Sequence, residues 1–264
     1  MQAKMVRAGR EGCKPVQLTI YGTNTIKEAV LSGKLRKTVY ASEKKWKNGL
    51  IDKDLLKLIK AKSVKIEIKN DNIFIKEFGK EAFIKGIAAT VEYNEKQYEE
   101  LFESKDRRPP FYLILDEITD PQNLGSIIRT ANCSGISGII VPKSNSIFIT
   151  SSVANVSQGA LFYVDIVRVT NIARVIDDLK KRGVWVIGLS ADSEGDIYSM
   201  DYNIPLAVVI GSEGKGLRRL TISKCESILK IPMVGNVNSL NAGISFAVMA
   251  YEVLRQRTYN KKTD

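Results

Sequence analysis

Short apolar runs alternate with helix-like segments from residue 111 to residue 257, and this alternation constrains the fold more than any other feature. The runs read "FYLILDEI", "GISGIIVP", "YVDIVRV", "VWVIGLS", "PLAVVIG" and "SILKIPM". The segments between them predict helices through Arg129, at about 150–158 and at 171–182, with a final helix from about 240 to 257. Apolar strands separated by helices indicate a parallel sheet covered on both faces, so the fold class is α/β.

A smaller α/β pattern precedes this one, at residues 15–93. The stretch "LTIYGTNTIKEAVLSGKLRKTVYAS" predicts a strand, a short helix and a second strand. Thr25 and Glu28 have the spacing of a capping box, and Gly33 is placed to end the helix. An amphipathic helix in "DKDLLKLIKA" and strands in "SVKIEIK" and "KGIAATVEY" complete the smaller domain.

Residues 94–110 are charged and end in two prolines, which cannot continue a helix. We therefore expect a linker there, between the smaller domain and a larger one at 111–264, and a flexible polar tail at 1–14. Arg107 and Arg108 in this linker could contact a phosphate backbone or could simply be solvated.

The chain is basic, with a net charge of +11 and a pI near 9.4. Residues 1–108 hold 24 lysines and arginines against 15 acidic residues, whereas the rest of the chain is nearly balanced. A basic N-terminal part favours a polyanionic partner such as a nucleic acid.

The chain contains no histidine, which excludes Ser-His-Asp hydrolysis, imidazole acid/base catalysis and His-ligated metals. Its three cysteines, Cys13, Cys133 and Cys225, are widely spaced and argue against a disulfide framework or a zinc site. We expect them to be small buried residues, and we expect no metal. The sequence has neither an apolar run of about 18 residues nor a signal-peptide pattern, so the expected location is cytoplasmic and away from membranes.

Three polar loops follow predicted strands: "TDPQN" (119–123), "GSEGKGL" (211–217) and "IPMVGNVNSLN" (231–241). Ligands of parallel α/β sheets bind beyond the carboxyl ends of the strands, so these loops are candidates for a binding site. The glycines of the second loop would let its backbone approach a flat or charged ligand closely. That loop fits neither the Walker nor the Rossmann glycine pattern, which disfavours a nucleotide triphosphatase or a dehydrogenase.

The last predicted helix is apolar on nearly every face from Leu240 to Met249. Such a helix must be covered all round, and a second copy of the chain would cover it, so we expect a homodimer. The alternative is a helix buried within one chain.

The segments "LDEITDPQNLGSIIRTA", "VVIGSEGKGL" and "IPMVGNVNSLNAGISFAVMAYEVLRQR" resemble, in sequence, order and separation, the three motifs of the SpoU (TrmH-type) RNA 2′-O-ribose methyltransferases of the SPOUT class. This resemblance spans residues 111–257. The stretch "YGTNTIKEAVLSGKLRKTVYAS" further resembles the L30e-like RNA-binding module of the subgroup that methylates a guanosine of large-subunit rRNA.

The resemblance implies a C-terminal parallel-sheet domain threaded into a trefoil knot, one of the rare exceptions to unknotted topology, with S-adenosylmethionine bound in the knot. The positions that match the cofactor pocket are Gly211, Gly214, Ile231, Met233 and Leu240. The positions that match substrate placement and catalysis are Asn123, Arg129, Glu213, Ser239 and Asn241, with Glu213 also shaping the pocket wall. RNA and a second copy of the chain are the implied partners.

Arg129 matches the arginine that is proposed as the general base of this family. A guanidinium has a pKa above about 12, so Arg129 could instead bind the adjacent phosphate and stabilise the developing alkoxide. Three structural alternatives stay open: Arg129 could pair with Asp116 or Asp120, Asn123 could cap the helix that follows it, and Gly214 could serve only as a turn former.

The chain departs from the family pattern at three places. It has Gly243 in "SLNAG" where relatives commonly have "SLNVS", Ile84-Lys85-Gly86 where many have His-Gln-Gly, and Phe162 where an acidic residue is frequent. These departures bear on the choice of RNA more than on the reaction. The expected activity is methyl transfer from S-adenosylmethionine to a ribose 2′-OH, with a guanosine of 23S rRNA as first choice. The alternatives are a tRNA substrate or a non-catalytic RNA-binding or resistance protein on the same fold.

Overall fold

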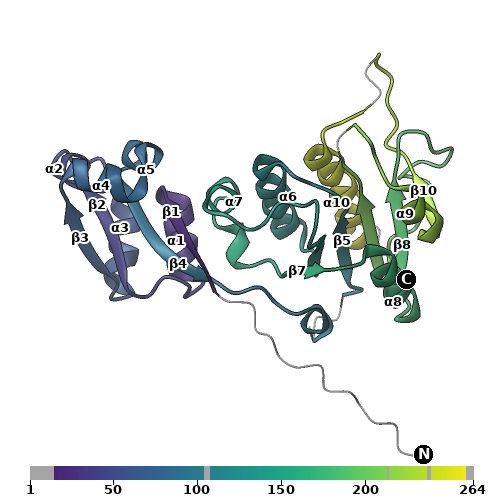
Figure 1. Cartoon of the computed structure of the whole chain (residues 1–264), viewed down its shortest axis with the longest axis horizontal. Helices are drawn as coiled ribbons and strands as arrows, with labels where there is room; N and C mark the ends of the chain where they lie inside the picture. The colour runs from purple at the N-terminus through teal and green to yellow at the C-terminus, as the bar shows by residue number, and fades with distance from the viewer. Residues whose placement is uncertain (1–14, 104–107, 213, 237–238, 260–264) are drawn as a thin grey trace, which may run out of the picture.

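The computed structural model describes residues 15–103, 108–212, 214–236 and 239–259 and contains two separate sheets (Figure 1). The N-terminal sheet has the order β1-β4-β2-β3. Its strands are β1 (Val16–Tyr21), β2 (Thr38–Ser42), β3 (Lys65–Lys69) and β4 (Ile87–Tyr93). Strand β4 is antiparallel to both β1 and β2, whereas β2 and β3 are parallel, so the sheet is mixed.

Helices cover both faces of the N-terminal sheet. Helices α1 (Thr23–Leu31) and α3 (Lys53–Ala61) pack over the face that carries buried Leu18 and Val39. The short helices α2 (Glu43–Lys47), α4 (Asp71–Phe78) and α5 (Lys80–Lys85) were not predicted. Phe74 and Phe78 of α4 pack with Tyr40 on the opposite face.

The predicted end of α1 is confirmed, because Gly33 has a positive φ of 71° just beyond the helix. The predicted capping box is wrong. The residue that caps α1 is Gly22, without a side-chain bond, and Thr25 is buried inside the helix. The spacing of Thr25 and Glu28 predicted that the Thr25 side chain caps the helix, but the packing of α1 buries that side chain in the core.

The C-terminal sheet has the order β10-β8-β9-β5-β6-β7, and all its neighbouring strands are parallel, as predicted. The strands are β5 (Phe111–Leu115), β6 (Gly138–Pro142), β7 (Ile166–Val169), β8 (Trp185–Leu189), β9 (Leu206–Ile210) and β10 (Ser227–Leu229). The helices are α6 (Pro121–Ser134), α7 (Ser151–Val156), α8 (Ile172–Lys181), α9 (Arg219–Lys224) and α10 (Ala242–Tyr259), with a 3₁₀ turn η2 (Ala160–Phe162). Alternate residues of β5 enter two different cores: Leu113 packs with residues of α6 and α10, and Ile114 with residues of α8.

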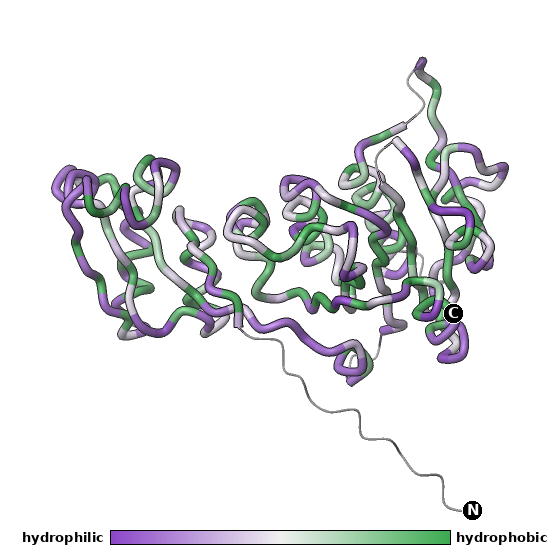
Figure 2. The backbone as a smooth tube through the Cα atoms, viewed as in Figure 1, coloured by the Kyte–Doolittle hydropathy of each residue, from purple (hydrophilic) through white to green (hydrophobic). Residues whose placement is uncertain are grey.

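Hydropathy follows this layering, with apolar stretches along the strands and polar residues on outer turns and loops (Figure 2). Among the described helices, none is long and apolar enough to cross a membrane. The threading of the C-terminal segment into a knot stays a prediction.

Helix α10 is covered on one face by its own chain. Phe246, Met249 and Val253 are buried there, and α10 packs against α6. Ile244 and Tyr251 remain 53% and 51% exposed on the other face. A second copy of the chain was expected to cover this apolar helix, but much of its apolar surface is covered by the same chain. A narrower apolar strip, with Ile244 and Tyr251, stays exposed.

The predicted linker is docked along β7. Lys96 forms a β-bridge with Val167, and Glu95 forms an ion pair with Arg168 at 2.7 Å. A 3₁₀ helix, η1 (Tyr98–Phe102), then places Phe102 against Tyr112 of β5. The predicted tail at 1–14 and Arg107 lie outside the described residues.

Candidate active site

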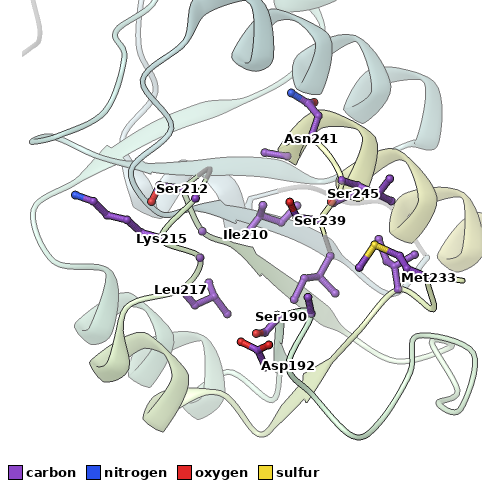
Figure 3. A pocket seen from close by; sticks show the side chains of 18 of the residues that line it. Ser190, Asp192, Ile210, Ser212, Lys215, Leu217, Met233, Ser239, Asn241 and Ser245 are labelled. Atoms are coloured by element: carbon purple, nitrogen blue, oxygen red, sulfur yellow. The ribbon is translucent and has the colours of Figure 1, made fainter. Parts of the chain in front are cut away.

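Three loops meet around a cavity of about 670 Å³ at the carboxyl ends of β8, β9 and β10 (Figure 3). The first loop follows β8 at residues 190–192, the second follows β9, and the third follows β10. A volume of this size lies within the roughly 300–1,000 Å³ of small-molecule sites. The cavity lies where a parallel α/β sheet places its ligands.

The second loop folds tightly against itself beside Gly211. A Cβ atom on Gly211 would lie 2.1 Å from the carbonyl oxygen of Gly216, so no larger residue fits without moving the loop. The Gly216 amide donates to the Ser212 carbonyl at 2.9 Å and closes the turn, in which Gly214 has a φ of 80°. The glycines expose backbone groups at the cavity, and Gly214 is also a turn former.

The predicted cofactor positions all line this cavity. They are Gly211, Gly214, Ile231, Met233 and Leu240, and the predicted polar positions Ser239 and Asn241 line the same cavity. Glu213 lies outside the described residues. The described part of the third loop projects beyond α10 in Figure 1, and Met233 and Leu240 on it are 36% and 39% exposed.

Asn123 and Asn241 connect the first loop to the third. The Asn241 side-chain nitrogen donates to the Asn123 side-chain oxygen at 2.8 Å. The Asn241 side-chain oxygen accepts from the Gly243 amide at 2.9 Å, at the start of α10. The side chain of Asp120, rather than that of Asn123, caps α6 by accepting from the Gln122 amide. The alternative in which Asn123 acts only as the cap of α6 is therefore wrong.

Arg129 lies on the exposed side of α6 and is not among the residues that line the cavity. It follows Asn123 by six positions, which is about 9 Å along a helix. Among the described residues, Arg129 forms no ion pair with Asp116 or Asp120; Asp120 caps α6, and Asp116 pairs with another arginine, Arg218. Arg129 is therefore an exposed side chain without an ion pair to either carboxylate.

Asp116 anchors the glycine-rich loop to the end of β5. Its buried carboxylate lies 2.6 Å from the Arg218 guanidinium and accepts from the Thr221 hydroxyl at 2.9 Å. The hydrogen bond to Asp116 raises the pKa of Arg218 above its ordinary value. These contacts hold the chain that follows Gly216 near the cavity.

Sequence reasoning missed the loop after β8, although it also follows a strand of the sheet. Ser190 and Asp192 of this loop line the cavity and lie beside each other in Figure 3, far from Asn241. The same strand-end rule could have selected "LSADSEG". This loop lies near the glycine-rich loop only because β8 is next to β9, and the sequence alone does not give that strand order.

The expectation that the cysteines are buried is wrong for Cys133, which is exposed on α6. Cys225 is partly buried, and this burial raises the pKa of its thiol to about 12. Cys13 lies outside the described residues. Within the described parts of the chain, no group of three or more Cys, Asp or Glu side chains is arranged to hold a metal ion.

The three departures from the family pattern lie in different surroundings. Gly243 is buried at the start of α10, where an added Cβ would lie 3.2 Å from the Asn241 side-chain oxygen and 3.6 Å from the Ser126 hydroxyl. Ile84 is 66% exposed on α5, and Phe162 packs partly buried against the main core. Only Gly243 is close to the cavity.

Comparison with known proteins identifies a family. Residues 110–251 match the model of the SpoU rRNA Methylase family. The chain is 44% identical over 173 residues to the putative TrmH family tRNA/rRNA methyltransferase YacO of Bacillus subtilis, covering 65% of this chain and 70% of that protein. It is 39% identical over 247 residues to a putative TrmH family tRNA/rRNA methyltransferase of Staphylococcus haemolyticus, covering 91% and 96%.

Solved structures agree with this match. The SpoU methyltransferase AviRb from Streptomyces viridochromogenes, in complex with AdoMet, superposes with a TM-score of 0.75 at 24% identity over 91% of this chain and 90% of that one. The AdoMet-bound rRNA methyltransferase from Sinorhizobium meliloti gives 0.71 at 23% identity, over 91% and 87%. At these identities the superpositions support the fold, and with the family match and the close relatives they lead to one conclusion. The chain belongs to the SpoU rRNA methylase family, the TrmH-type tRNA/rRNA methyltransferases.

Proposed function

We propose that this protein transfers a methyl group from S-adenosylmethionine to a ribose 2′-hydroxyl of RNA. The observation that carries the proposal is the convergence of the second and third motifs on one cavity, with Asn123 of the first motif hydrogen-bonded to Asn241 of the third. Family membership and the AdoMet complexes of two structural relatives support the same reaction.

The cavity suits S-adenosylmethionine. Apolar side chains on its wall, including Ile210, Ile231 and Leu240, suit a flat adenine ring, and Ser190 and Asp192 offer polar partners. The close approach of the Gly216 backbone to Gly211 keeps this loop compact at the cavity wall. Gly211, Gly214, Ile231, Met233 and Leu240 would hold the cofactor. When bound, S-adenosylmethionine supplies a methyl group activated by a sulfonium.

Arg129 acts on the RNA in this proposal. Because Arg129 of the first motif is exposed, it can meet RNA arriving at the surface, bind a phosphate and stabilise the oxyanion that develops on the ribose. We favour this electrostatic role over general-base action because a guanidinium rarely loses its proton. The 2′-hydroxyl proton then passes to solvent water, and S-adenosylhomocysteine leaves. Ser239 and Asn241 orient the substrate from the cavity wall, and Glu213 acts with them.

A second copy of the chain completes the proposed assembly. Ile244 and Tyr251 are half exposed and lie seven positions apart on α10, with partly buried Val248 between them. This spacing places them on one helix face, where a partner could bury them. Because α10 packs on α6, such a partner would also approach the helix that carries Arg129. Sedimentation of a monomer alone at micromolar concentration would reject the dimer.

The N-terminal domain captures the RNA in this proposal. Its share of the positive charge is large, and a hollow of about 410 Å³ beside its sheet has Lys34, Arg36, Lys37 and Tyr40 on its wall. Three cationic side chains around one hollow suit the phosphates of a bound RNA strand. The first-choice substrate is a guanosine of 23S rRNA in the cytoplasm, and tRNA is the second choice.

Mapping ribose methylation in rRNA and tRNA by mass spectrometry, in cells with and without the gene, tests the activity. Loss of one methyl group at one nucleotide identifies both the reaction and its substrate. Calorimetry with S-adenosylmethionine separates the enzyme from a non-catalytic RNA-binding or resistance protein on the same fold. Absence of cofactor binding together with an unchanged methylation map would reject the proposal.

A further inference from the structure

Strand β1 lies at the edge of the N-terminal sheet, and its free edge faces the C-terminal domain. One side of β1 pairs with β4, which leaves outward backbone groups that need partners. Side chains of α7 bind three of these groups. The Thr19 amide donates to the Ser151 hydroxyl at 2.8 Å, and the Tyr21 amide donates to the Asn155 side-chain oxygen at 2.8 Å.

Asn155 takes the place of a residue in a neighbouring strand. Its side-chain oxygen accepts from the Tyr21 amide, and its side-chain nitrogen donates to the Thr19 carbonyl at 3.0 Å. In a parallel β-ladder, a residue accepts from the amide that follows its opposite residue and donates to the carbonyl that precedes it. The Asn155 side chain makes the same two bonds, and the residue opposite it is Ile20. The same nitrogen donates to the Ser151 carbonyl at 2.7 Å, which fixes the orientation of the amide.

The contact is buried and extends beyond one side chain. Asn155 is 7% exposed, and one cluster of buried apolar residues includes Ile20 of β1 and Val153 of α7. A Cβ on Gly159 would lie 2.5 Å from the Cβ of Glu28 on α1, which shows how closely the two domains approach.

The rim of the contact carries a further bond, from the Tyr163 hydroxyl to the Glu28 carboxylate at 2.9 Å. The segment that joins the domains is also fixed, because Glu95 pairs with Arg168 on β7. The N-terminal domain is thus attached at two separate places.

We infer that Asn155 is a positioning residue: by completing the edge of β1 it holds the N-terminal domain at one orientation to the cavity. The consequence for catalysis rests on the proposed function. RNA bound by the N-terminal domain then presents one nucleotide to Arg129, because the distance between the RNA-binding surface of that domain and Arg129 is fixed. The attachment itself is independent of any reaction and can be measured without RNA or cofactor.

Amide hydrogen exchange of the full chain, followed by NMR, tests the attachment. The Thr19 amide is the reporter, because its own acceptor, Ser151, is unchanged in Asn155→Ala. The wild-type Thr19 amide should be protected, and Asn155→Ala should speed its exchange at least about tenfold by releasing the domains. The amide of Ile20, which points towards β4, should keep its rate, and exposed Asn72→Ala should behave as wild type. An unprotected Thr19 amide in the wild type, or an unchanged rate in Asn155→Ala, overturns the inference.

Tyr163→Phe serves if Asn155→Ala does not fold. It removes only the half-exposed bond to Glu28 and should speed Thr19 exchange about twofold. An unchanged Thr19 rate in that variant counts against the docked orientation.

Kinetics test the positioning role. On folded RNA, Asn155→Ala should raise KM or spread the methyl group over neighbouring nucleotides, while its dissociation constant for S-adenosylmethionine stays within about twofold of the wild-type value. Unchanged KM and an unchanged single product reject the positioning role. Wild-type protein that methylates no RNA but protects Thr19 would reject the proposed function and leave the attachment standing.

Discussion

Asn241 donates a hydrogen bond to Asn123 at 2.8 Å across 118 residues of sequence. The same Asn241 side chain accepts from the Gly243 amide and so begins α10. One residue therefore fixes the third loop to both α6 and α10, and its contribution to stability can be separated from its contribution to activity.

Asn241→Ala should lower the free energy of unfolding by about 2 kcal/mol, because it removes a helix cap and a partly buried hydrogen bond together. Urea denaturation measures this loss. Asn132→Ala, on the exposed side of α6, is the control and should change stability by less than about 0.5 kcal/mol. Equal stabilities of the two variants would contradict the double role of Asn241.

Arg129→Ala should reduce methyl transfer by about 100-fold to 1,000-fold while leaving affinity for S-adenosylmethionine unchanged, because Arg129 acts on RNA and does not line the cavity. Initial rates with RNA and calorimetry with the cofactor measure the two effects. Arg129→Lys, which keeps the positive charge but loses the planar pair of N–H donors of the guanidinium, should recover part of the rate. Weakened cofactor binding in Arg129→Ala would place the arginine in the cofactor pocket instead.

Gly211→Ala should weaken cofactor binding by about tenfold or more, because its new Cβ would meet the Gly216 carbonyl oxygen at 2.1 Å and force the loop outward. Calorimetry measures the change. Gly235→Ala is the matched control, since nothing lies within 4 Å of an added Cβ there. Similar affinity in both variants would mean that the packing around Gly211 does not shape the pocket.

We expect the Glu252 carboxylate to stabilise the folded protein at neutral pH and to lose this effect in acid. Hydrogen bonds from Arg255 and then from Gln256 hold the pKa of its carboxyl below the ordinary value of 4.5. A depressed folded pKa means that the stabilisation is fully present above pH 4.5 and is lost as the pH falls below it. Urea midpoints between pH 7 and pH 3 should therefore fall less in Glu252→Gln than in the wild type. Exposed Glu92→Gln should follow the wild type, and identical pH profiles for all three would refute the assignment.

The two described cysteines should react at very different rates. Cys133 is exposed on α6, whereas burial raises the pKa of the Cys225 thiol to about 12, so little thiolate forms near pH 8. Thiol titration of the native protein should lose one fast-reacting group in Cys133→Ser and none in Cys225→Ser. A fast group lost in Cys225→Ser would show that this thiol is accessible.

The sequence determined the type and order of most elements. Apolar runs such as "FYLIL" and "LAVVI" bury both faces of a strand whatever surrounds them, and they became β5 and β9 of a parallel sheet. The need for glycine in the second loop could also be predicted from the sequence. The backbone atoms that exclude a Cβ at Gly211 belong to the same short loop, so no distant partner is involved. Resemblance, rather than periodicity, supplied the chemical roles of the loop residues.

Tertiary structure decided which elements became neighbours. The strand order placed β8 beside β9 and so brought Asp192 to the cavity, while the packing of α6 left Arg129 and Cys133 exposed. Asn155 reads in sequence as an ordinary polar helix residue, yet it completes the edge of β1, which lies 134 residues earlier in the chain. Periodicity specifies which face of an element is buried, but the partner of that face depends on long-range packing, which no local pattern encodes.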